Sequence, residues 1–373
     1  MDNNKVIGVK DMQTFPLECL TIEEAKKLQF KLIDVITHNL TGQEFLSMGD
    51  LGVVPGYGRP VITTKVEKIL AEFFGSQDAV LVRGSGTGAI RFALQAVLRP
   101  GDRVLVHDSP VYSTTSTTME SMGLDLARVD MNDTQALLKA LKDDIKLVYI
   151  QHSRQKSSDR YDMYELIRAI RKVADVPIIT DENYTVLKTR YIGTQLGANA
   201  SCFSCFKLLG PTGIGCVICD SDIAGRIREM NYSGGGQVQG FEAMEVMRSM
   251  VYVPVMQAIQ AEETAKVTDA INSAEVKGAK AAYIVNAQSR TILVELEEPI
   301  SARVIKEAGK LGAATHPVGS ESRYEAVPMF YRASGTFIKE NPEIKDYIIR
   351  INPMRSGSET VLRILKEAME KVR

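Results

Sequence analysis

The stretch Ser201–Cys219, SCFSCFKLLGPTGIGCVIC, contains one charged residue, Lys207, among apolar residues and glycines. Cysteine, phenylalanine and leucine neighbours are expected to remove its ammonium partly from water. Desolvation disfavours the charged ammonium and frees the nitrogen lone pair to attack a carbonyl. Lys207 is therefore a candidate for forming a Schiff base. The alternative is an ordinary lysine that extends along its aliphatic stem to water.

The composition is that of a globular protein without a dominant charge. The chain has 373 residues, of which 45% are hydrophobic and 24% are charged. Its 45 basic and 46 acidic residues give a net charge of -1, which provides no overall attraction for nucleic acid or a membrane surface. The N-terminal MDNNKVIGVKDMQ lacks the apolar run of a signal peptide, and no segment has the apolar length of a membrane span. A cytoplasmic protein is expected.

The cysteines do not form a disulfide framework. Four of the five lie in two CxxC pairs, Cys202/Cys205 and Cys216/Cys219. Paired zinc thiolates need a tight turn, which is usually rich in glycine or polar residues. The residues between these cysteines instead indicate buried strand, in which side chains three positions apart face opposite sides. Small core cysteines are expected, and no metal site.

Helix and strand patterns alternate through much of the chain. Thr21 and Glu24 form a capping-box pattern for a helix to residue 38, and Thr64 and Glu67 form another for a helix that Gly75 ends. Further helices are expected at 134–141 and 163–173, and strands at 79–82, 103–106, 124–129, 146–150, 177–180 and 216–219. This alternation predicts an open, mostly parallel sheet whose ligands lie beyond the carboxyl ends of the strands.

A glycine-rich turn, GSGTG at residues 84–88, lies between the first expected strand of this series and a helix. In such a strand–turn–helix arrangement, free backbone N–H groups and the helix dipole converge on a phosphate. The spacing matches neither the Walker pattern nor GxGxxG with its downstream acid, so no nucleotide is specifically indicated. The alternative is a tight turn without a ligand.

Polar residues follow several strands at the edge where a ligand is expected. Asp181 is either a carboxylate that pairs with a cation at the base of a pocket or a helix N-cap. Gln151 and His152 either line the same pocket or satisfy loop backbone groups. Tyr112 lies in a loop after a strand at the same edge.

Two arginines outside these strand ends are candidates for binding anions. The loop GDLGVVPGYGRP carries Tyr57 and Arg59, and is either a linker or an arm that brings a phenol and a guanidinium to an anion. Arg350 either binds an anion between domains or forms a surface salt bridge. The last third is expected to contain a linking helix at 241–272, a strand at 291–296, a helix at 302–311 and a strand at 347–351.

Together, these segments resemble the fold-type-I pyridoxal-phosphate (PLP) enzymes of the aminotransferase superfamily over nearly the whole chain. The runs KLLGPTGIG at 207–215 and SGGGQ at 233–237 resemble class V aminotransferases, and KLLGP also resembles selenocysteine synthase-like proteins. The first half is similar to the cysteine/methionine-metabolism lyases in the run 57–59, the helix through Glu67, and the runs 85–89 and 110–114.

The resemblance implies an α/β fold, the PLP-dependent transferase fold type I, with a mostly parallel central sheet, helices on both faces and a smaller carboxyl-terminal α/β domain. An N-terminal helical segment is expected at 1–50, a large PLP-binding domain at 51–245, and a linking helix with the small domain at 246–373. The family also implies a homodimer with shared active sites and a small-molecule substrate.

The resemblance also assigns roles to the candidate residues. Lys207 would hold the cofactor as an internal aldimine and then move the Cα proton, and Asp181 would pair with the pyridinium nitrogen. The expected phosphate ligands are Ser85, Gly86, Thr87 and Ser204. Tyr112 would stack on the ring, Gln151 would contact the cofactor, and Tyr57 and Arg59 would reach the phosphate of a neighbouring subunit. Arg350 would hold the substrate carboxylate, and His152 would line the substrate pocket.

The implied activity is that of a PLP enzyme acting on a small amino acid or amine through an external aldimine, with transamination ahead of β- or γ-elimination. Class V enzymes carry a histidine before the lysine and a glutamine three residues after the aspartate, where this chain has Phe206 and Tyr184. A cysteine desulfurase is disfavoured, because no cysteine follows Cys219. The alternatives are an eliminating lyase, a non-catalytic PLP-binding protein, and an α/β protein that binds a nucleotide at the glycine turn.

Overall fold

The computed structural model describes residues 13–285, 290–317, 321–334, 338 and 342–372. The chain divides into two compact units. The large unit consists of Leu20–Ser153 and Tyr161–Val255, and the small unit consists of the described residues among 13–19, 154–160 and 256–372. The division falls inside helix α9 (Gly240–Asn272). The boundary expected between residues 245 and 246 lies in the same helix.

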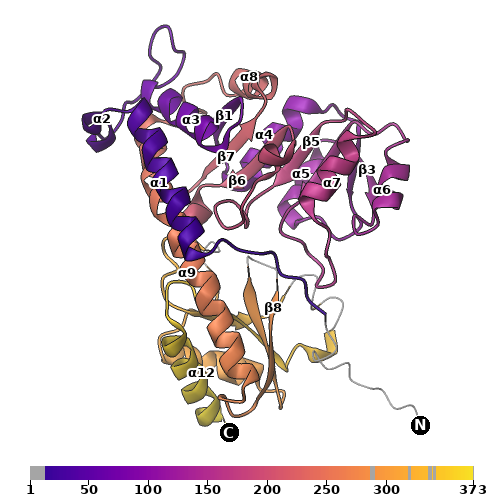
Figure 1. The fold of residues 1–373 in the computed structure, drawn as a ribbon, viewed down its shortest axis with the longest axis vertical. Helices are drawn as coiled ribbons and strands as arrows, with labels where there is room; N and C mark the ends of the chain where they lie inside the picture. The colour runs from indigo at the N-terminus through magenta and orange to yellow at the C-terminus, as the bar shows by residue number, and fades with distance from the viewer. Residues whose placement is uncertain (1–12, 286–289, 318–320, 335–337, 339–341, 373) are drawn as a thin grey trace. The chain divides into compact units, whose positions relative to one another are not determined.

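A seven-stranded sheet forms the centre of the large unit, in the order β1-β7-β6-β5-β4-β2-β3 (Figure 1). Strands β2 to β6 run parallel, whereas β7 runs antiparallel to its neighbours β1 and β6. The strands are β1 (Asp78–Arg83), β2 (Arg103–His107), β3 (Asp125–Val129), β4 (Leu147–Gln151), β5 (Ile178–Asp181), β6 (Ala200–Ser204) and β7 (Ile214–Cys219). The predicted open, mostly parallel sheet is confirmed.

Helices cover both faces of this sheet. On one face, α4 (Ser85–Val97) and α8 (Ser221–Met230) pack on the strands. On the other face, α3 (Val61–Phe74) and the first part of α9 pack on β1, β6 and β7, while α7 (Met163–Arg171) packs on β4 and β5. The other helical segments of this unit are α1 (Ile22–Asn39), α2 (Gly42–Leu46), α5 (Ser113–Ser121), α6 (Thr134–Ala140), η2 (Gly193–Leu196) and η3 (Phe206–Leu208). Coverage on both faces explains why every residue of β5, β6 and β7 is buried.

The first predicted capping box forms as expected. The Glu24 backbone N–H donates to the Thr21 hydroxyl, and the Thr21 backbone N–H donates to the Glu24 carboxylate. The end of α3 is also confirmed, because Gly75 adopts the left-handed conformation with a φ of 68°.

The predicted start of α3 is wrong. The helix begins at Val61, so Thr64 lies inside it, with its hydroxyl bonded to the carbonyl of Pro60. The carboxylate of Asp50 accepts the backbone N–H groups of Val61 and Ile62 over 2.6 and 3.0 Å. A cap supplied from an earlier loop therefore replaces the local capping box.

The sheet separates the four clustered cysteines. Cys205 and Cys216 lie in the apolar cluster with α3 and α9, whereas Cys202 and Cys219 lie in the cluster with α4 and α8. The expectation that the members of each CxxC pair face opposite sides is confirmed. Burial raises the pKa of all four thiols, so they are neutral core residues.

The small unit contains a four-stranded antiparallel sheet in the order β10-β11-β9-β8. Its elements are β8 (Ala279–Val285), β9 (Thr291–Leu296), α10 (Ser301–Lys310), β10 (Met329–Arg332), η4 (Pro342–Ile344), β11 (Ile348–Asn352) and α12 (Ser358–Val372). Helices α10 and α12 and the end of α9 pack on one face. The predictions of β9, α10 and β11 are confirmed, whereas β8 and β10 were not predicted. Among the described helices, none is long and apolar enough to cross a membrane.

Candidate functional site

Asp181 is buried at the carboxyl end of β5, with a hydrogen-bond donor on each of its oxygens. The Tyr149 hydroxyl donates to Oδ2 over 3.0 Å. The backbone N–H and the side-chain amide of Asn183 donate to Oδ1 over 3.0 and 2.7 Å. Burial raises the pKa of Asp181, whereas these hydrogen bonds and the charge of Lys207 act in the opposite direction. A carboxylate in this environment is suited to receive a cation.

Lys207 lies in η3, between β6 and the turn that leads to β7. The residue is half-buried, as expected from its apolar neighbours. Its ammonium lies 4.8 Å from the centre of the Tyr184 ring, and Tyr184 belongs to the loop after Asp181. The charge of Lys207 also lowers the pKa of Asp181. The structure therefore brings Lys207 and Asp181 within electrostatic reach of each other.

The glycine turn before α4 is joined to the strand that precedes Lys207. Gly84 and Ser85 have positive φ angles of 96° and 57°, and the backbone N–H groups of both donate to the carbonyl of Gly213. The Ser85 hydroxyl lies 2.7 Å from the Ser204 hydroxyl at the end of β6. Two predicted phosphate ligands are therefore in direct contact.

The first turn of α4 offers donors to an anion. Within the described ranges, the backbone N–H groups of Gly86 and Thr87 donate to no other residue. First-turn N–H groups point outward from a helix N-terminus, where the helix dipole also favours negative charge. The Thr87 hydroxyl lies 3.0 Å from the hydroxyl of Thr114 in α5, and Tyr112, which precedes α5, is 44% exposed.

The two polar residues at the end of β4 lie on opposite faces of the sheet. Gln151 pairs in register with Asp181, so strand alternation places both on the face of α4. His152 instead contacts Glu182, with Nδ1 2.6 Å from Oε2. Burial tends to raise the pKa of Glu182, but the contact with His152 and a hydrogen bond from Thr185 hold it below its ordinary value. The His152–Glu182 pair is therefore separate from the Asp181 face.

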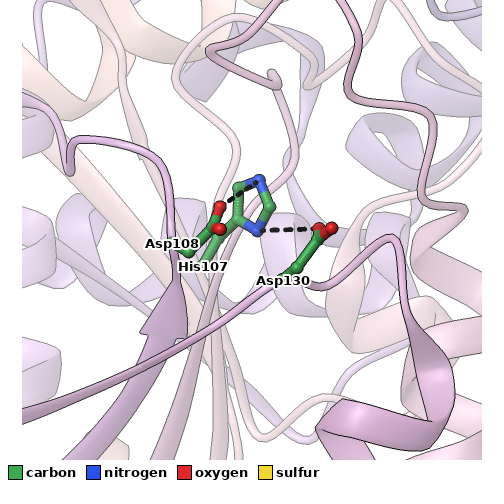
Figure 2. Close-up of side chains that lie close together, drawn as sticks. All are labelled: His107, Asp108 and Asp130. Atoms are coloured by element: carbon green, nitrogen blue, oxygen red, sulfur yellow. Dashed lines mark ion pairs between the residues drawn. The ribbon is translucent and has the colours of Figure 1, made fainter.

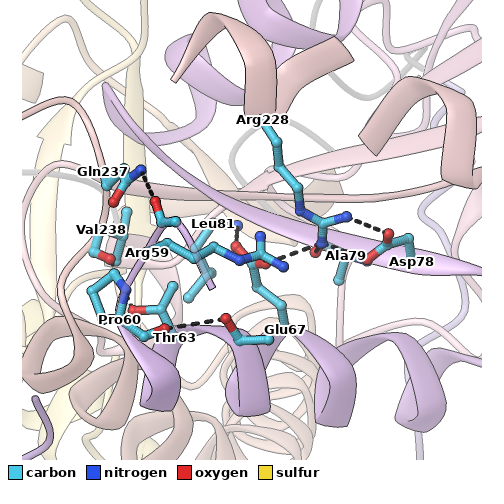
Figure 3. A network of polar contacts seen from close by, with 12 residues as sticks. Arg59, Pro60, Thr63, Glu67, Asp78, Ala79, Leu81, Arg228, Gln237 and Val238 are labelled. Carbon is cyan, nitrogen blue, oxygen red and sulfur yellow. Dashed lines mark hydrogen bonds and ion pairs between the residues drawn. The ribbon is translucent and has the colours of Figure 1, made fainter. Parts of the chain in front are cut away.

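Arg59 is paired inside its own chain (Figure 3). Its Nη1 lies 2.7 Å from Oε2 of buried Glu67 in α3, and Nη2 of Arg228 lies 3.1 Å from the same oxygen. Tyr57, in the same loop as Arg59, is 55% exposed. The side-chain amide of Gln237 donates to a carbonyl of this loop, so the two glycine-rich loops contact each other. The role of Tyr57 and Arg59 in a neighbouring subunit stays a prediction.

A histidine and two aspartates meet at the carboxyl ends of β2 and β3 (Figure 2). His107 Nε2 lies 3.8 Å from Asp108 Oδ1, and Nδ1 lies 4.0 Å from Asp130 Oδ1. The Met131 backbone N–H donates to Nδ1, so the lone pair of this nitrogen is used within the chain. A neutral ring then carries its proton on Nε2, toward Asp108. The arrangement is that of a hydrogen-bonded histidine between two carboxylates.

Arg350 lies in β11 of the small unit and is only 3% exposed. The alternative of a surface salt bridge is therefore wrong. Its guanidinium carbon lies 5.7 Å from the ring centre of Tyr331, its cross-strand partner on β10. Burial raises the pKa of Tyr331 to about 12, against the opposing effect of Arg350. The Arg350 Nε is buried without a hydrogen-bond partner among the residues that the structure describes, which makes it a candidate to bind an anion.

Sequence reasoning did not identify three residues that contact predicted site residues: Tyr149 and Asn183 contact Asp181, and Glu182 contacts His152. Asn183 follows Asp181 by two positions, the spacing of a local Asx-type hydrogen bond, and this signal was available. Tyr149 and Glu182 gave no such signal, because their contacts depend on β4 lying beside β5.

Comparison with known proteins defines the class of this chain. Residues 61–293 match the model of the aminotransferase class-V family. The match covers more than half of the chain, so the chain belongs to the aminotransferase class-V family, among the fold-type-I PLP-dependent enzymes. The predicted superfamily and fold class are confirmed.

Within this class, the chain is similar to one bacterial protein along its whole length. It is 50% identical over 364 residues to the uncharacterized protein YhfS of Escherichia coli (strain K12), covering 97% of this chain and 100% of that protein. The crystal structure of the PLP-dependent protein YhfS from Escherichia coli matches with a TM-score of 0.95 and 49% identity, over 96% of this chain and 100% of that one. Residues 265–365 match the model of the YhfS-like C-terminal domain.

Lyases are more distant relatives. The chain is 25% identical over 226 residues to L-methionine gamma-lyase of Fusobacterium nucleatum subsp. polymorphum, which covers 58% of this chain and 56% of that protein. The crystal structure of cystathione gamma lyase from Micromonospora echinospora matches with a TM-score of 0.72 and 15% identity, over 92% of this chain and 99% of that one. At this identity the likeness concerns the fold alone.

Proposed function

We propose that this chain is a PLP-dependent enzyme that acts on a small amino acid or amine, with Lys207 as the residue that binds the cofactor covalently. The observation that carries the proposal is the meeting of Lys207, the buried Asp181 and the first turn of α4 at one edge of the sheet. The contact between Ser85 and Ser204 ties that turn to the strand that ends just before Lys207. These three features correspond to the aldehyde, the ring nitrogen and the phosphate of PLP.

The residues at this edge fit the cofactor. The N–H groups of Gly86 and Thr87 and the Ser85 hydroxyl offer donors to a phosphate. Asp181 would be stabilised by a protonated ring nitrogen, because an adjacent cation opposes the effect of burial on its pKa. Lys207 would supply the amine for the aldehyde. Further proposed contacts are Ser204 with the phosphate, Tyr112 with the ring, and Gln151 on the Asp181 face.

When bound, PLP supplies an electron sink that stabilises the electron pair left on the substrate Cα after its proton departs. Lys207 is proposed to remove and return this proton, as a half-buried amine beside Tyr184. Asp181 is proposed to keep the ring nitrogen protonated. Arg350 is proposed to hold the substrate carboxylate, since its Nε is buried without a partner in the described chain.

We infer β- or γ-elimination as the reaction and transamination as the second candidate, which reverses the order that the resemblance implied. The similarity to L-methionine gamma-lyase supports elimination, in which the Cα–H bond and the bond to a β- or γ-leaving group break, and hydrolysis yields a 2-oxo acid and ammonia. The aminotransferase class-V match supports transamination, in which the amino group passes to an acceptor. Product analysis separates them, because a lyase releases ammonia without an acceptor and a transaminase stalls without one.

Spectroscopy and peptide mapping test the covalent site. The purified protein with PLP should show visible absorbance that borohydride abolishes, and the reduced cofactor should map to Lys207. Lys207→Ala should lose both signals, whereas Lys266→Ala, an exposed lysine of α9, should keep them. Modification of a different lysine, or a protein that takes up no PLP, would contradict the proposal.

We also propose that the active form is a homodimer in which Tyr57 and Arg59 contact the cofactor phosphate of the partner. The exposed Tyr57 ring supports this proposal. Arg59 is paired with Glu67 in its own chain, so on dimer formation it would either hold both Glu67 and the phosphate or leave Glu67 for the phosphate. Mixing inactive Lys207→Ala and Arg59→Ala subunits tests it. Activity that appears only after mixing is expected, because one hybrid site then has both residues. No recovery from a mixture that forms hybrid dimers would contradict sharing.

A further inference from the structure

Asn183 lies between two parts of the proposed cofactor site. It contacts Asp181 on one side and the first turn of α4 at Gly86 on the other. We propose that Asn183 is a positioning residue that couples the phosphate-binding turn to the carboxylate at the ring nitrogen, and that Gly86 lacks a side chain in order to admit it. This inference rests on the proposed function.

On the Asp181 side, Asn183 fixes the orientation of the carboxylate. Its backbone N–H and its Nδ2 both donate to Oδ1, over 3.0 and 2.7 Å. The Tyr149 hydroxyl occupies Oδ2 from the neighbouring strand, over 3.0 Å. With donors on both oxygens, the carboxylate cannot rotate without breaking a buried hydrogen bond, which costs free energy. The Asn183 side chain is therefore part of the support that aims Asp181.

On the α4 side, Asn183 fills the space that a side chain at residue 86 would need. A Cβ added to Gly86 would lie 1.9 Å from Asn183 Oδ1, 2.6 Å from Cγ and 2.7 Å from Nδ2. Such separations are far below van der Waals contact, so one of the two groups would have to move. Gly86 also contributes one of the proposed phosphate-binding N–H groups. A displacement of Asn183 would therefore disturb both Asp181 and the proposed phosphate-binding turn at Gly86.

The hydrogen bonding of Asn183 indicates that its placement has a function beyond packing. Its Oδ1 is buried and accepts no hydrogen bond from the described residues. A buried acceptor without a donor lowers stability, and an apolar residue of similar size would avoid this penalty. The hydrogen bond from its Nδ2 to Asp181 is the contribution that offsets this penalty. Loss of that donor removes one of the effects that oppose the burial-raised pKa of Asp181.

A double-mutant cycle on the holoenzyme tests the coupling. The variants are Gly86→Ala, Asn183→Ala and the double variant, and the readouts are the PLP dissociation constant and the pH midpoint of the cofactor absorbance. Asn183→Ala should weaken PLP binding roughly tenfold, as expected for loss of a hydrogen bond to a charged group. It should also raise the pH midpoint, because a less protonated ring withdraws less charge from the Lys207 nitrogen. Gly86→Ala should weaken binding at least as much.

The double variant is the decisive measurement. If the two residues meet as proposed, removing the Asn183 side chain relieves the clash, and the double variant binds PLP more tightly than Gly86→Ala alone. Additive losses, or an Asn183→Ala protein with unchanged binding and midpoint, would overturn the inference. Gly225→Ala is the matched control, because a Cβ at this helical glycine of α8 meets nothing within 4 Å.

Two further measurements separate the possible failures. Thermal unfolding of each apoprotein identifies any variant that has lost its fold, and the Asn183→Ala readouts then decide the question without Gly86→Ala. A wild-type protein that takes up no PLP at Lys207 would refute the proposed function itself. A wild-type protein that binds PLP, with no coupling in the cycle, would refute only the role of Asn183.

Discussion

The large unit has two buried carboxylates, Glu67 and Asp181, whose hydrogen-bond and ion-pair partners differ. Burial raises the pKa of both. Glu67 is surrounded by cations, because the guanidinium groups of Arg59 and Arg228 both contact its Oε2 (Figure 3). Its other oxygen accepts the backbone N–H of Leu81, in the edge strand β1. Glu67 is therefore a structural acid that satisfies a sheet edge and anchors the loop of Arg59.

Asp181 has neutral donors instead. The Tyr149 hydroxyl and the Asn183 amide occupy its oxygens, and the charge of Lys207 lowers its pKa without overcoming the effect of burial. A carboxylate paired with cations inside the chain already has its charge balanced, whereas a buried carboxylate with neutral donors is suited to a cation from outside. The partners of each acid, rather than its burial, therefore distinguish the structural role of Glu67 from the binding role proposed for Asp181.

The largest effect is expected from Glu67→Gln. The substitution removes the carboxylate partner of Arg59, while Arg228 keeps Asp78, so the free energy of unfolding should fall by about 3 kcal/mol, the lower end of the range for a broken buried pair. Urea unfolding of the holoenzyme measures this loss. Glu72→Gln, an exposed position of the same helix, should change it by no more than about 0.5 kcal/mol. A loss below about 1 kcal/mol for Glu67→Gln would contradict the structural role of Glu67.

Asp181→Asn should affect catalysis rather than stability. Without the carboxylate the ring nitrogen loses its charged partner, and kcat/KM should fall about 10²- to 10³-fold. The free energy of unfolding of the apoprotein should hold or rise, because a neutral amide avoids the burial of a charge. Steady-state kinetics and urea unfolding give both numbers. A loss of stability as large as that of Glu67→Gln would mean that Asp181 also has a structural role.

A smaller effect is expected in the pH dependence of stability, where Glu182 contrasts with its neighbour Asp181. The pKa of Glu182 lies below its ordinary 4.5, because His152 and other contacts outweigh burial. Its contribution is therefore complete above pH 4.5 and is lost as the pH falls through the folded-state pKa. Glu182→Gln should remove this acid-side loss in unfolding curves from about pH 3 to about pH 6.

Asp181 should act with the opposite sign in the apoprotein. Its folded-state pKa is raised, so its contribution is complete at low pH and is lost as the pH rises through the folded-state pKa. Asp181→Asn should flatten that part of the curve. An apoprotein curve that responds in the same direction to Asp181→Asn and Glu182→Gln would contradict the assigned shifts.

The smallest effect is expected from Tyr149→Phe. The ring keeps its place in the apolar cluster beside α4, and only the hydrogen bond to Asp181 Oδ2 is removed. The expected loss is about 1 kcal/mol, which corresponds to roughly fivefold weaker PLP binding. Titration of the apoprotein with PLP measures it. A loss of a hundredfold or more would mean that Tyr149 contacts the cofactor itself.

Local patterns were sufficient for the framework of the large unit. The Thr21–Glu24 cap, the glycine that ends α3 and the strand that ends at Asp181 all depend on residues close in sequence. The start of α3 could not be predicted, because its cap is Asp50 from an earlier loop. In the small unit, β8 is alanine-rich and β10 is only four residues long, so neither had a clear strand pattern.

The sequence indicated individual residues of the candidate site, but not the contacts between residues that are distant in sequence. Residue type and position at strand ends identified Asp181, Lys207 and the turn at Ser85. The Arg59–Glu67 pair was not predicted, because it depends on how a loop folds back on the helix that follows it. The contact of Asn183 with Gly86 requires β5 and α4 to be placed in space, which a single sequence does not provide.

The buried thiols of β6 and β7 have a practical consequence. Neutral thiols in the core react poorly with alkylating reagents, whereas Cys19 is partly exposed. Alkylation of one of these cysteines under native conditions would therefore show that β6 or β7, which flank Lys207, had opened locally to solvent. Mass spectrometry of iodoacetamide-treated protein would measure how often these two strands open. The experiment needs no engineered label, because the cysteines are part of the chain.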